Sequence, residues 1–254
     1  MCRGCGGPGW GPRRGEVVVR VFVINLARSV ARRQTMAEQL RQLGLPYEIW
    51  AAIDGRLLDE AEYLQQGGAS GLFPGEVGCY QSHLTLWRKI RDEQIPCAFI
   101  LEDDARIDPD TLQVLNALET RVADFDVARL SAIEKQVGTV LQRVNDTRQL
   151  VVPTKNPSGL AGYVLTNEGA KRLVNLAEPP CIPVDTLVDR SWVKGVRMVM
   201  VSPAPVRHAE GVESTITDVK RRGLRSYDSG FCERVNRSVR KRLFVRSMVR
   251  GWAR

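Results

Sequence analysis

Short apolar runs and amphipathic segments alternate from the beginning of the chain. Residues 16–26 (EVVVRVFVINL) form a nearly continuous run of β-branched side chains, which is typical of a strand buried on both faces. Residues 30–44 carry apolar side chains at roughly helical spacing and end at Gly44, so they predict a helix. Residues 46–55 predict a second strand. A strand, a helix and a strand in this order indicate an α/β fold, whose ligands bind at the carboxyl ends of strands.

The same alternation continues through the rest of the chain, without an internal repeat, and predicts one domain that ends near Gly223. Asp108 and Pro109 resemble a helix start, with the aspartate as N-cap and the proline at the first helical position. The further predicted elements are a helix over 76–94, a strand over 97–104, a helix over 108–119, a strand over 124–131, a hairpin over 137–153, a strand and helix over 158–177, and a last strand over 196–205.

Three acidic residues, Glu102, Asp103 and Asp104, end the predicted strand over 97–104. Neighbouring like charges repel by roughly 4 kcal/mol at about 4 Å and an effective dielectric near 20. On charge alone, a solvated turn is the simpler explanation. However, the strand is apolar on both faces and therefore central, and its carboxyl end is a place where ligands collect. Hard oxygen ligands suit Mg²⁺ or Mn²⁺, so the sequence favours a site for a divalent cation and a diphosphate.

The sequence lacks the motifs of several other classes of phosphate-binding and metal-binding proteins. The chain has no Walker-A sequence, no kinase glycine loop and no G-x-G-x-x-G after the first strand. Only two histidines, His83 and His208, are present, too few for the histidine array of a zinc hydrolase. Cys2 and Cys5 form a lone C-x-x-C, and the six scattered cysteines are expected to be free thiols.

The net charge of +8 is concentrated at the C-terminal end. Residues 220–254 contain twelve Lys/Arg and only two Asp/Glu, so the preceding body is almost neutral. This distribution argues against a generally cationic nucleic-acid binder, and we expect no nucleic-acid partner. Composition divides the chain into a disordered Gly-rich extension (1–16), an α/β domain (17–223) and a basic amphipathic tail (224–254).

Five segments together resemble glycosyltransferase family 25, the lipopolysaccharide and lipooligosaccharide sugar transferases. They are VFVINLARSVARR, GEVGCYQSHLTLWRKI, AFILEDDA, SGLAGYVLTNEGAKRL and PVDTLVDR, and they occur in the order of the family. The resemblance implies a GT-A-like α/β fold with a central mixed sheet flanked by helices. It also implies an inverting hexosyltransferase that uses a UDP-sugar, most often UDP-galactose, and a glycan or glycolipid acceptor; the acid cluster adds the expectation of metal dependence. A non-catalytic glycan- or nucleotide-binding module on the same scaffold is the alternative.

The acid cluster and the family resemblance together indicate which residues are candidates for the functional site. For Mn²⁺ or Mg²⁺, the candidates are Asp104, Glu102 at two-residue spacing, and His208, which could equally be an ordinary loop histidine. Asp185 is the candidate general base and Asp189 the alternate, although Asp185 could instead cap a helix. The candidate donor-binding residues are Asn25, Leu26, Arg28, Arg33, Ser82, His83, Asp103, Gly159 and Gly162. Among these, Arg33 could be a helix-surface arginine and His83 a core histidine.

The tail suggests a membrane surface as a further partner. From Phe231 onward, apolar side chains fall on one predicted helical stripe among basic residues; the stripe is Val235, Val239, Leu243, Met248 and Trp252. A helix of this kind binds anionic lipid, with a solvated tail as the alternative. The sequence has no apolar run of transmembrane length and its N-terminus has no signal-peptide pattern. We therefore expect a cytoplasmic protein, peripheral on the cytoplasmic face of the inner membrane.

Overall fold

The computed structural model describes residues 19–133, 137–209 and 231–253, with the side chains of 231–237 excepted. The extension expected over 1–16 and the domain end expected near Gly223 lie outside the described residues. The first strand is described from Arg20, so the beginning of the run over 16–26 also lies outside them.

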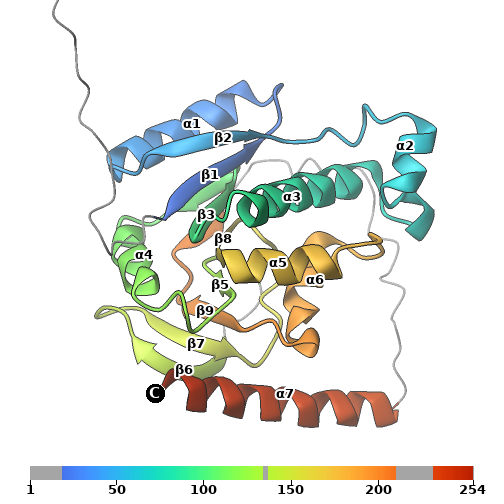
Figure 1. Cartoon of the computed structure of the whole chain (residues 1–254). Helices are drawn as coiled ribbons and strands as arrows, with labels where there is room; N and C mark the ends of the chain where they lie inside the picture. The colour runs from blue at the N-terminus through green and yellow to red at the C-terminus, as the bar shows by residue number, and fades with distance from the viewer. Residues whose placement is uncertain (1–18, 134–136, 210–230, 254) are drawn as a thin grey trace, which may run out of the picture.

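An eight-stranded mixed sheet forms the centre of the molecule (Figure 1). Its strand order is β2-β1-β3-β8-β5-β9-β7-β6. β1 pairs in parallel with β2 and β3, whereas β8 runs antiparallel to β3 and β5. The bounds are β1 (Arg20–Asn25), β2 (Tyr47–Ala51), β3 (Cys97–Glu102), β5 (Val127–Arg129), β6 (Gly138–Arg143), β7 (Gln149–Pro153), β8 (Gly162–Thr166) and β9 (Met198–Ser202).

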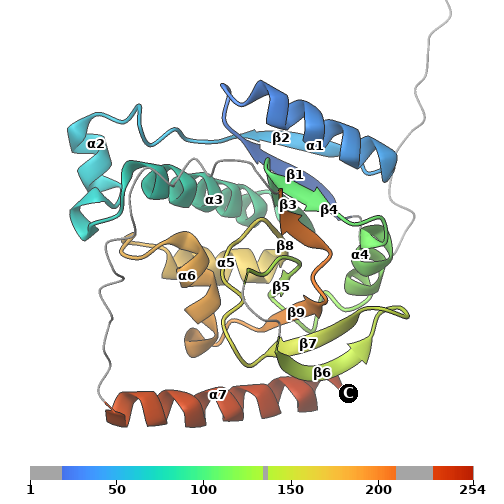
Figure 2. The ribbon, with the colours of Figure 1, turned by 180° about the vertical axis from the view of Figure 1, so that it is seen from behind.

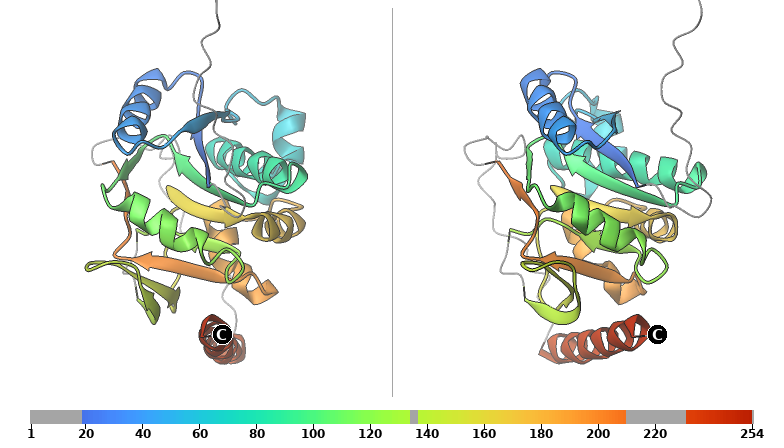
Figure 3. Two further views of the ribbon diagram at one scale, coloured as in Figure 1. Left: turned by 60° about the vertical axis from the view of Figure 1, so that its left-hand side comes forward. Right: turned by 90° about the vertical axis from the view of Figure 1, so that its left-hand side faces the viewer.

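Helices cover both faces of the sheet, and the alternating side chains of β1 show why. Val21 and Val23 belong to one buried apolar cluster, which includes residues of α1, α4 and α7, whereas Phe22 and Ile24 belong to a second, with residues of α3, α5 and α6. Figures 2 and 3 show the two sides of the sheet. The helices are α1 (Val30–Gln42), α2 (Glu60–Gln65), α3 (Pro74–Asp92), α4 (Thr111–Glu119), α5 (Asn167–Leu176), α6 (Val184–Arg190) and α7 (Phe231–Trp252), with 3₁₀ turns η1 (Gly68–Ser70) and η2 (Ser191–Lys194).

The predicted fold class, α/β with a central mixed sheet flanked by helices, is confirmed. Two short strands were not predicted: β4 (Ala105–Ile107) and β10 (Val206–His208), which pair antiparallel as a separate two-stranded sheet. This small sheet brings the segment that follows β9 back beside the acid cluster.

The predicted start of α4 is wrong by two residues. Asp110, not Asp108, precedes the first helical residue, and Pro109 lies outside the helix. The physical reason is Arg148 in the β6–β7 hairpin, whose guanidinium binds Asp108 at 2.7 Å and Asp110 at 2.5 Å. The aspartates therefore bind the hairpin, and neither side chain caps the helix.

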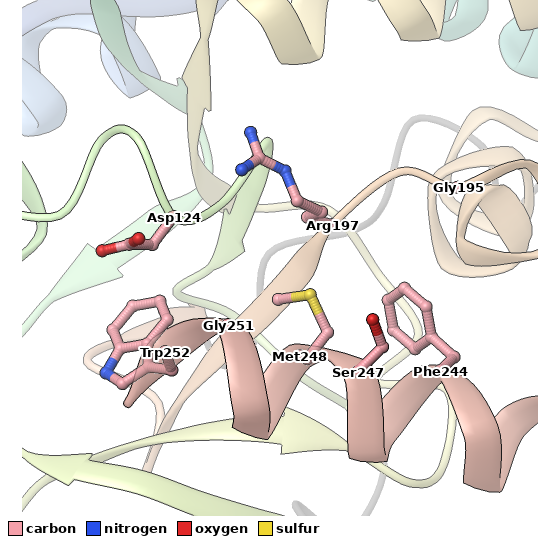
Figure 4. A pocket seen from close by; sticks show the side chains of 8 residues that line it. All are labelled: Asp124, Gly195, Arg197, Phe244, Ser247, Met248, Gly251 and Trp252. Carbon is pink, nitrogen blue, oxygen red and sulfur yellow. The ribbon is translucent and has the colours of Figure 1, made fainter. Parts of the chain in front are cut away.

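The predicted apolar stripe of the tail is also wrong in part. Met248 and Trp252 are buried in the core, but Val239 and Leu243 are 50% and 57% exposed, and the side chain of Val235 lies outside the described residues. The inward face of α7 is set by its position against β6 and β7. It also meets η2. A crevice shown in Figure 4 lies between α7 and the segments that carry Asp124, Gly195 and Arg197; on the helix it is lined by Phe244, Ser247, Met248, Gly251 and Trp252.

The ammonium of Lys241, a basic residue of α7, lies 4.5 Å from the centre of the Trp192 ring. Burial lowers the pKa of this lysine to about 8. Among the residues that the structure describes, no helix has both the length and the apolar character needed to cross a bilayer.

Candidate functional site

The carboxyl ends of β1 and β3 bring two predicted site residues into contact. The strands are parallel neighbours, so the loops that follow them leave the sheet at the same edge. Asn25, the last residue of β1, is 2% exposed, and its amide donates to Asp103 Oδ2 at 2.6 Å. The same amide donates to the carbonyl of Ser29 at 3.1 Å, which fixes the β1–α1 loop beside the acids. Leu26 lies in this loop, and its carbonyl accepts from the Ser29 amide.

Glu102, Asp104 and His208 meet in one cluster. Pairing of β4 with β10 places His208 opposite Ala105, directly after the acids. One ligand atom from each of the three residues lies within 4.8 Å of the other two. Within the described residues, Asp104 Oδ1 is buried without a hydrogen-bond partner, and His208 Nδ1 lies 3.6 Å from it. The cluster thus offers two carboxylates and an imidazole, and one carboxylate oxygen still lacks a partner in the described part of the structure. This set of ligands fits a divalent cation such as Mn²⁺ or Mg²⁺.

Arg32 of α1 places a positively charged guanidinium beside the acids. Its guanidinium lies 3.3 Å from Asp103 and 3.8 Å from Asp104. Burial raises the pKa of Asp104, but contact with His208 and the charge of Arg32 outweigh burial, so this pKa lies below its usual value. The contact with Asp104 in turn raises the pKa of His208. Burial raises the pKa of Asp103 despite Asn25 and Arg32. The two neighbouring aspartates therefore have pKa values shifted in opposite directions, upward for Asp103 and downward for Asp104.

His83 lies beneath the cluster and is fully buried in α3. Its Nε2 lies 3.3 Å from Glu102 Oε1, and its Nδ1 lies 2.9 Å from the hydroxyl of Tyr163. Cys79, one turn earlier in α3, forms a second group of close ligand atoms with His83 and Glu102. Burial, followed by the charge of Glu102, raises the pKa of Cys79 well above its ordinary value, which disfavours a thiolate ligand.

The loop before β8 lies beside His208. Ser158 and Gly159 have φ values of 55° and 65°, in the left-handed region. A Cβ at Gly159 would lie 3.2 Å from His208 Nε2, so glycine permits a close approach here. Gly162, at the start of β8, packs more closely still, because a Cβ there would be only 2.8 Å from Val206. The Gly159 amide points to Asp185 Oδ2 at 3.4 Å, which places this half-buried carboxylate beside the loop.

Asp189, predicted as an alternate base, occupies a structural position instead. Its side chain is 3% exposed and forms an ion pair with Arg129, which is fully buried. Its second oxygen accepts from the Ser158 amide at 2.9 Å, while Arg129 donates to the carbonyls of Ser158 and Gly159. Asp189 is therefore engaged in holding the loop, and an acceptor hydroxyl has no access to it.

Three predicted donor-binding residues do not reach the acids. Arg33 is exposed, in keeping with the alternative of a helix-surface arginine, and it is its neighbour Arg32 that contacts Asp103. Arg28 pairs with Asp54, which follows β2. The hydroxyl of Ser82 is buried: it accepts from the Ile53 amide at 2.8 Å and donates to a carbonyl of its own helix. Ser82 thus anchors the segment after β2.

Arg32, Tyr163 and Arg129 are the important residues that sequence reasoning missed. A signal for Arg32 was present, because it lies four and eight residues before Met36 and Leu40 and continues their buried helical face. Tyr163 and Arg129 gave no such signal, since one resembles an ordinary apolar strand residue and the other an exposed charge. Their partners come from distant parts of the chain.

Comparisons with known proteins identify the family of the chain. The family model described as glycosyltransferase family 25 (LPS biosynthesis protein) matches residues 18–188. Procollagen galactosyltransferase 1-A of Xenopus laevis is 32% identical over 182 residues, which are 65% of this chain and 30% of that protein. A putative glycosyltransferase of Haemophilus influenzae is 28% identical over 191 residues, or 72% of this chain and 67% of that one. The chain thus spans less than a third of the Xenopus relative.

Solved structures give a weaker likeness. A glycosyltransferase involved in the glycosylation of the major capsid of PBCV-1 aligns with 76% of this chain and 94% of its own, at a TM-score of 0.45 and 10% identity. The family model, in contrast, covers the β1–α1 loop, the acid cluster, the Gly159 loop and Asp185. The chain belongs to glycosyltransferase family 25, as the resemblance of its sequence segments predicted.

Proposed function

We propose that the protein transfers a hexose, galactose in the first instance, from a UDP-sugar to a hydroxyl group of a glycan or glycolipid, with inversion and with Mn²⁺ or Mg²⁺ as cofactor. One observation carries the proposal: Glu102, Asp104 and His208 converge at the carboxyl end of a central strand, and an orphaned carboxylate oxygen lies among them. Galactosyltransferases among its relatives support the choice of sugar.

Each part of the site has a role in this reaction. Glu102, Asp104 and His208 would hold the cation, which neutralises the charge of a leaving diphosphate. Asn25 and Arg32 orient Asp103 at the mouth of the β1–α1 loop, where a nucleoside ribose would accept or donate hydrogen bonds. A diphosphate therefore meets the acids only through a cation, because the bare carboxylates would repel it.

Asp185 is proposed as the general base. Its carboxylate is half-buried beside the Gly159 loop and, among the described residues, forms no ion pair, in contrast to Asp189. The acceptor oxygen forms a bond to the anomeric carbon as its proton passes to Asp185. The bond from that carbon to the diphosphate breaks, and its electron pair leaves with UDP. A single displacement of this kind inverts the anomeric carbon.

The substitution Asp104→Asn tests the proposal. It retains shape but removes a charged ligand, so we expect Mn²⁺ affinity and transfer from UDP-galactose to fall by about 10²-fold, with an unchanged melting temperature. Binding of Mn²⁺ is measured by calorimetry, transfer by UDP release, and product configuration by NMR. Asp124→Asn is the matched control, because Asp124 is also half-buried in an ion pair, with Arg121, but lies near α7. Equal transfer by the wild type and Asp104→Asn contradicts the metal assignment.

The same measurements separate transfer from a non-catalytic binding role. A binding module would be stabilised by UDP-sugars in thermal-shift assays and yet release no UDP, even with Mn²⁺ and a range of acceptors. Stabilisation by GDP- or CMP-sugars alone would instead contradict the proposed donor.

We further propose that the exposed face of α7 binds an anionic membrane surface at the cytoplasmic face of the inner membrane. Val239 and Leu243 are exposed there, close to the exposed Arg240, Arg242 and Arg246. Each basic residue at such an interface contributes about 1 kcal/mol to binding. A glycolipid acceptor would make this location useful to the enzyme.

A further inference from the structure

Three buried side chains connect the core of the molecule to Glu102. The indole Nε1 of Trp87 lies 2.7 Å from the Tyr163 hydroxyl, which lies 2.9 Å from His83 Nδ1. The other imidazole nitrogen, Nε2, lies 3.3 Å from Glu102 Oε1. Trp87 and His83 are one helical turn apart in α3, Tyr163 is in β8 and Glu102 ends β3. All except Glu102 are fully buried.

The chemistry of these groups fixes the direction of every proton. An indole N–H can only donate, so the Tyr163 oxygen accepts from Trp87. The single hydroxyl proton of Tyr163 is then available for His83 Nδ1, and in the described part of the chain this hydroxyl has no other partner. Nδ1 is therefore the acceptor, and the neutral imidazole carries its proton on Nε2. That proton faces Glu102 Oε1, which accepts it as a carboxylate.

The arrangement disfavours the other tautomer of His83, in which Nδ1 would donate to the Tyr163 hydroxyl. Were Nδ1 protonated, Tyr163 would accept two hydrogen bonds, and its own buried proton would have no acceptor. A buried donor left without a partner is costly, by about 1–3 kcal/mol in general. Burial also raises the pKa of Tyr163 well above its ordinary value, so the hydroxyl retains its proton.

We propose that Trp87, Tyr163 and His83 form a positioning relay, which orients Glu102 toward the candidate cation site by holding it with an Nε2–H donor. The inference rests on the proposed function, because it takes Glu102 as a cation ligand. None of the three relay residues touches a substrate or a cation: they act through Glu102. Outer hydrogen-bond partners of this kind commonly alter metal affinity about 10- to 100-fold.

The tautomer is the first test, and it needs no metal. The chain has only two histidines, so His208→Ala leaves a single imidazole and assigns its ¹⁵N signals. In metal-free protein we expect the signals of a protonated Nε2 and an unprotonated Nδ1 for His83. A proton on Nδ1, a rapid exchange between the two tautomers, or an imidazolium would overturn the relay.

The second test removes the Tyr163 hydroxyl. In Tyr163→Phe, we expect Mn²⁺ to bind at least tenfold more weakly in calorimetry, and the tautomer of His83 to become mixed. Tyr80→Phe is the matched control: Tyr80 is also buried, and its hydroxyl donates to the carbonyl of Ala177, away from the acids. Tyr80→Phe should leave both measurements unchanged. An equal effect of the two substitutions would reveal a general loss of packing and overturn the proposal.

A third variant covers the case in which Tyr163→Phe does not fold. His83→Gln supplies an amide N–H in place of Nε2–H, and should restore most of the Mn²⁺ affinity that His83→Leu loses. Equal affinities in these two variants would overturn the relay. Wild-type protein that binds no Mn²⁺ would contradict the proposed function itself, whereas tight binding unaffected by Tyr163→Phe would contradict the relay alone.

Discussion

At the candidate cation site, protons and a cation would compete for the same side chains. His208 can hold a cation only as a neutral imidazole, and the contact with Asp104 raises its pKa. Asp104, in contrast, has a lowered pKa and is ionised throughout the neutral range. Of these two candidate ligands, therefore, His208 is the one whose protonation changes near neutral pH.

This difference predicts a pH-dependent affinity. Below the raised pKa of His208, a cation must displace a proton, so Mn²⁺ affinity should fall as the pH decreases, by up to about tenfold per unit. Above this pKa, affinity should be constant. Calorimetry between pH 5.5 and 8.5 measures the profile. His208→Gln, which cannot be protonated in this range, should bind more weakly at pH 8 but lose the dependence; a slope that persists in this variant would assign it to another group.

Arg32 and Arg33 illustrate what a single residue in a sequence can reveal. Both follow the first strand, and the resemblance favoured Arg33, but the buried face of α1 carries Arg32 to Asp103. The helical spacing to Met36 and Leu40 contained that answer. Asp189 is different, because nothing local distinguishes it from Asp185: only the distant Arg129 does.

At the scale of elements, the loop before β8 is held by a buried ion pair. Arg129 of β5 and Asp189 of α6 bind each other and the backbone of Ser158 and Gly159, so three elements share one contact. Burial raises the pKa of Asp189 although the charge of Arg129 opposes this. The pair thus keeps the left-handed loop conformation beside His208.

Breaking this pair should be costly. In Asp189→Leu, the guanidinium of Arg129 is buried without its counter-ion, and we expect the free energy of unfolding to fall by about 3–5 kcal/mol. Urea denaturation measures it. The double variant Arg129→Met/Asp189→Leu should lose less than Asp189→Leu alone, since no unpaired charge is left. The exposed pair of Arg143 and Asp146 provides the control, and Arg143→Ala should leave stability unchanged. A comparable loss in this control would contradict the role of burial.

At the scale of the whole molecule, α7 has two faces with different partners. Met248 and Trp252 complete the core cluster, and the carbonyl of Trp252 accepts from Arg121 at 2.6 Å. Deletion of the helix would therefore expose core residues, and it is a poor test of membrane binding. Substitutions on the outward face separate the two roles.

We expect the wild-type protein to sediment with vesicles that contain anionic phospholipid, and not with neutral vesicles. Replacing Arg240, Arg242 and Arg246 by Gln should weaken binding by about fivefold per residue, because each contributes about 1 kcal/mol. Arg143→Gln, which alters an exposed basic residue in the β6–β7 hairpin, serves as the control. Sedimentation that is equal for the triple variant and the wild type would contradict the membrane proposal.

The sequence by itself determined the alternation of strands and helices, the acid cluster at a strand end and the family, because these depend on local periodicity and on contiguous motifs. Only the tertiary structure decided that His208 joins Glu102 and Asp104, that Arg32 rather than Arg33 meets Asp103, and that Asp189 is locked by Arg129. The physical reason is that protonation, burial and pairing are set by groups far apart in the chain. Whether a carboxylate can act as a metal ligand, a general base or a structural ion-pair partner depends on the residues that folding places beside it.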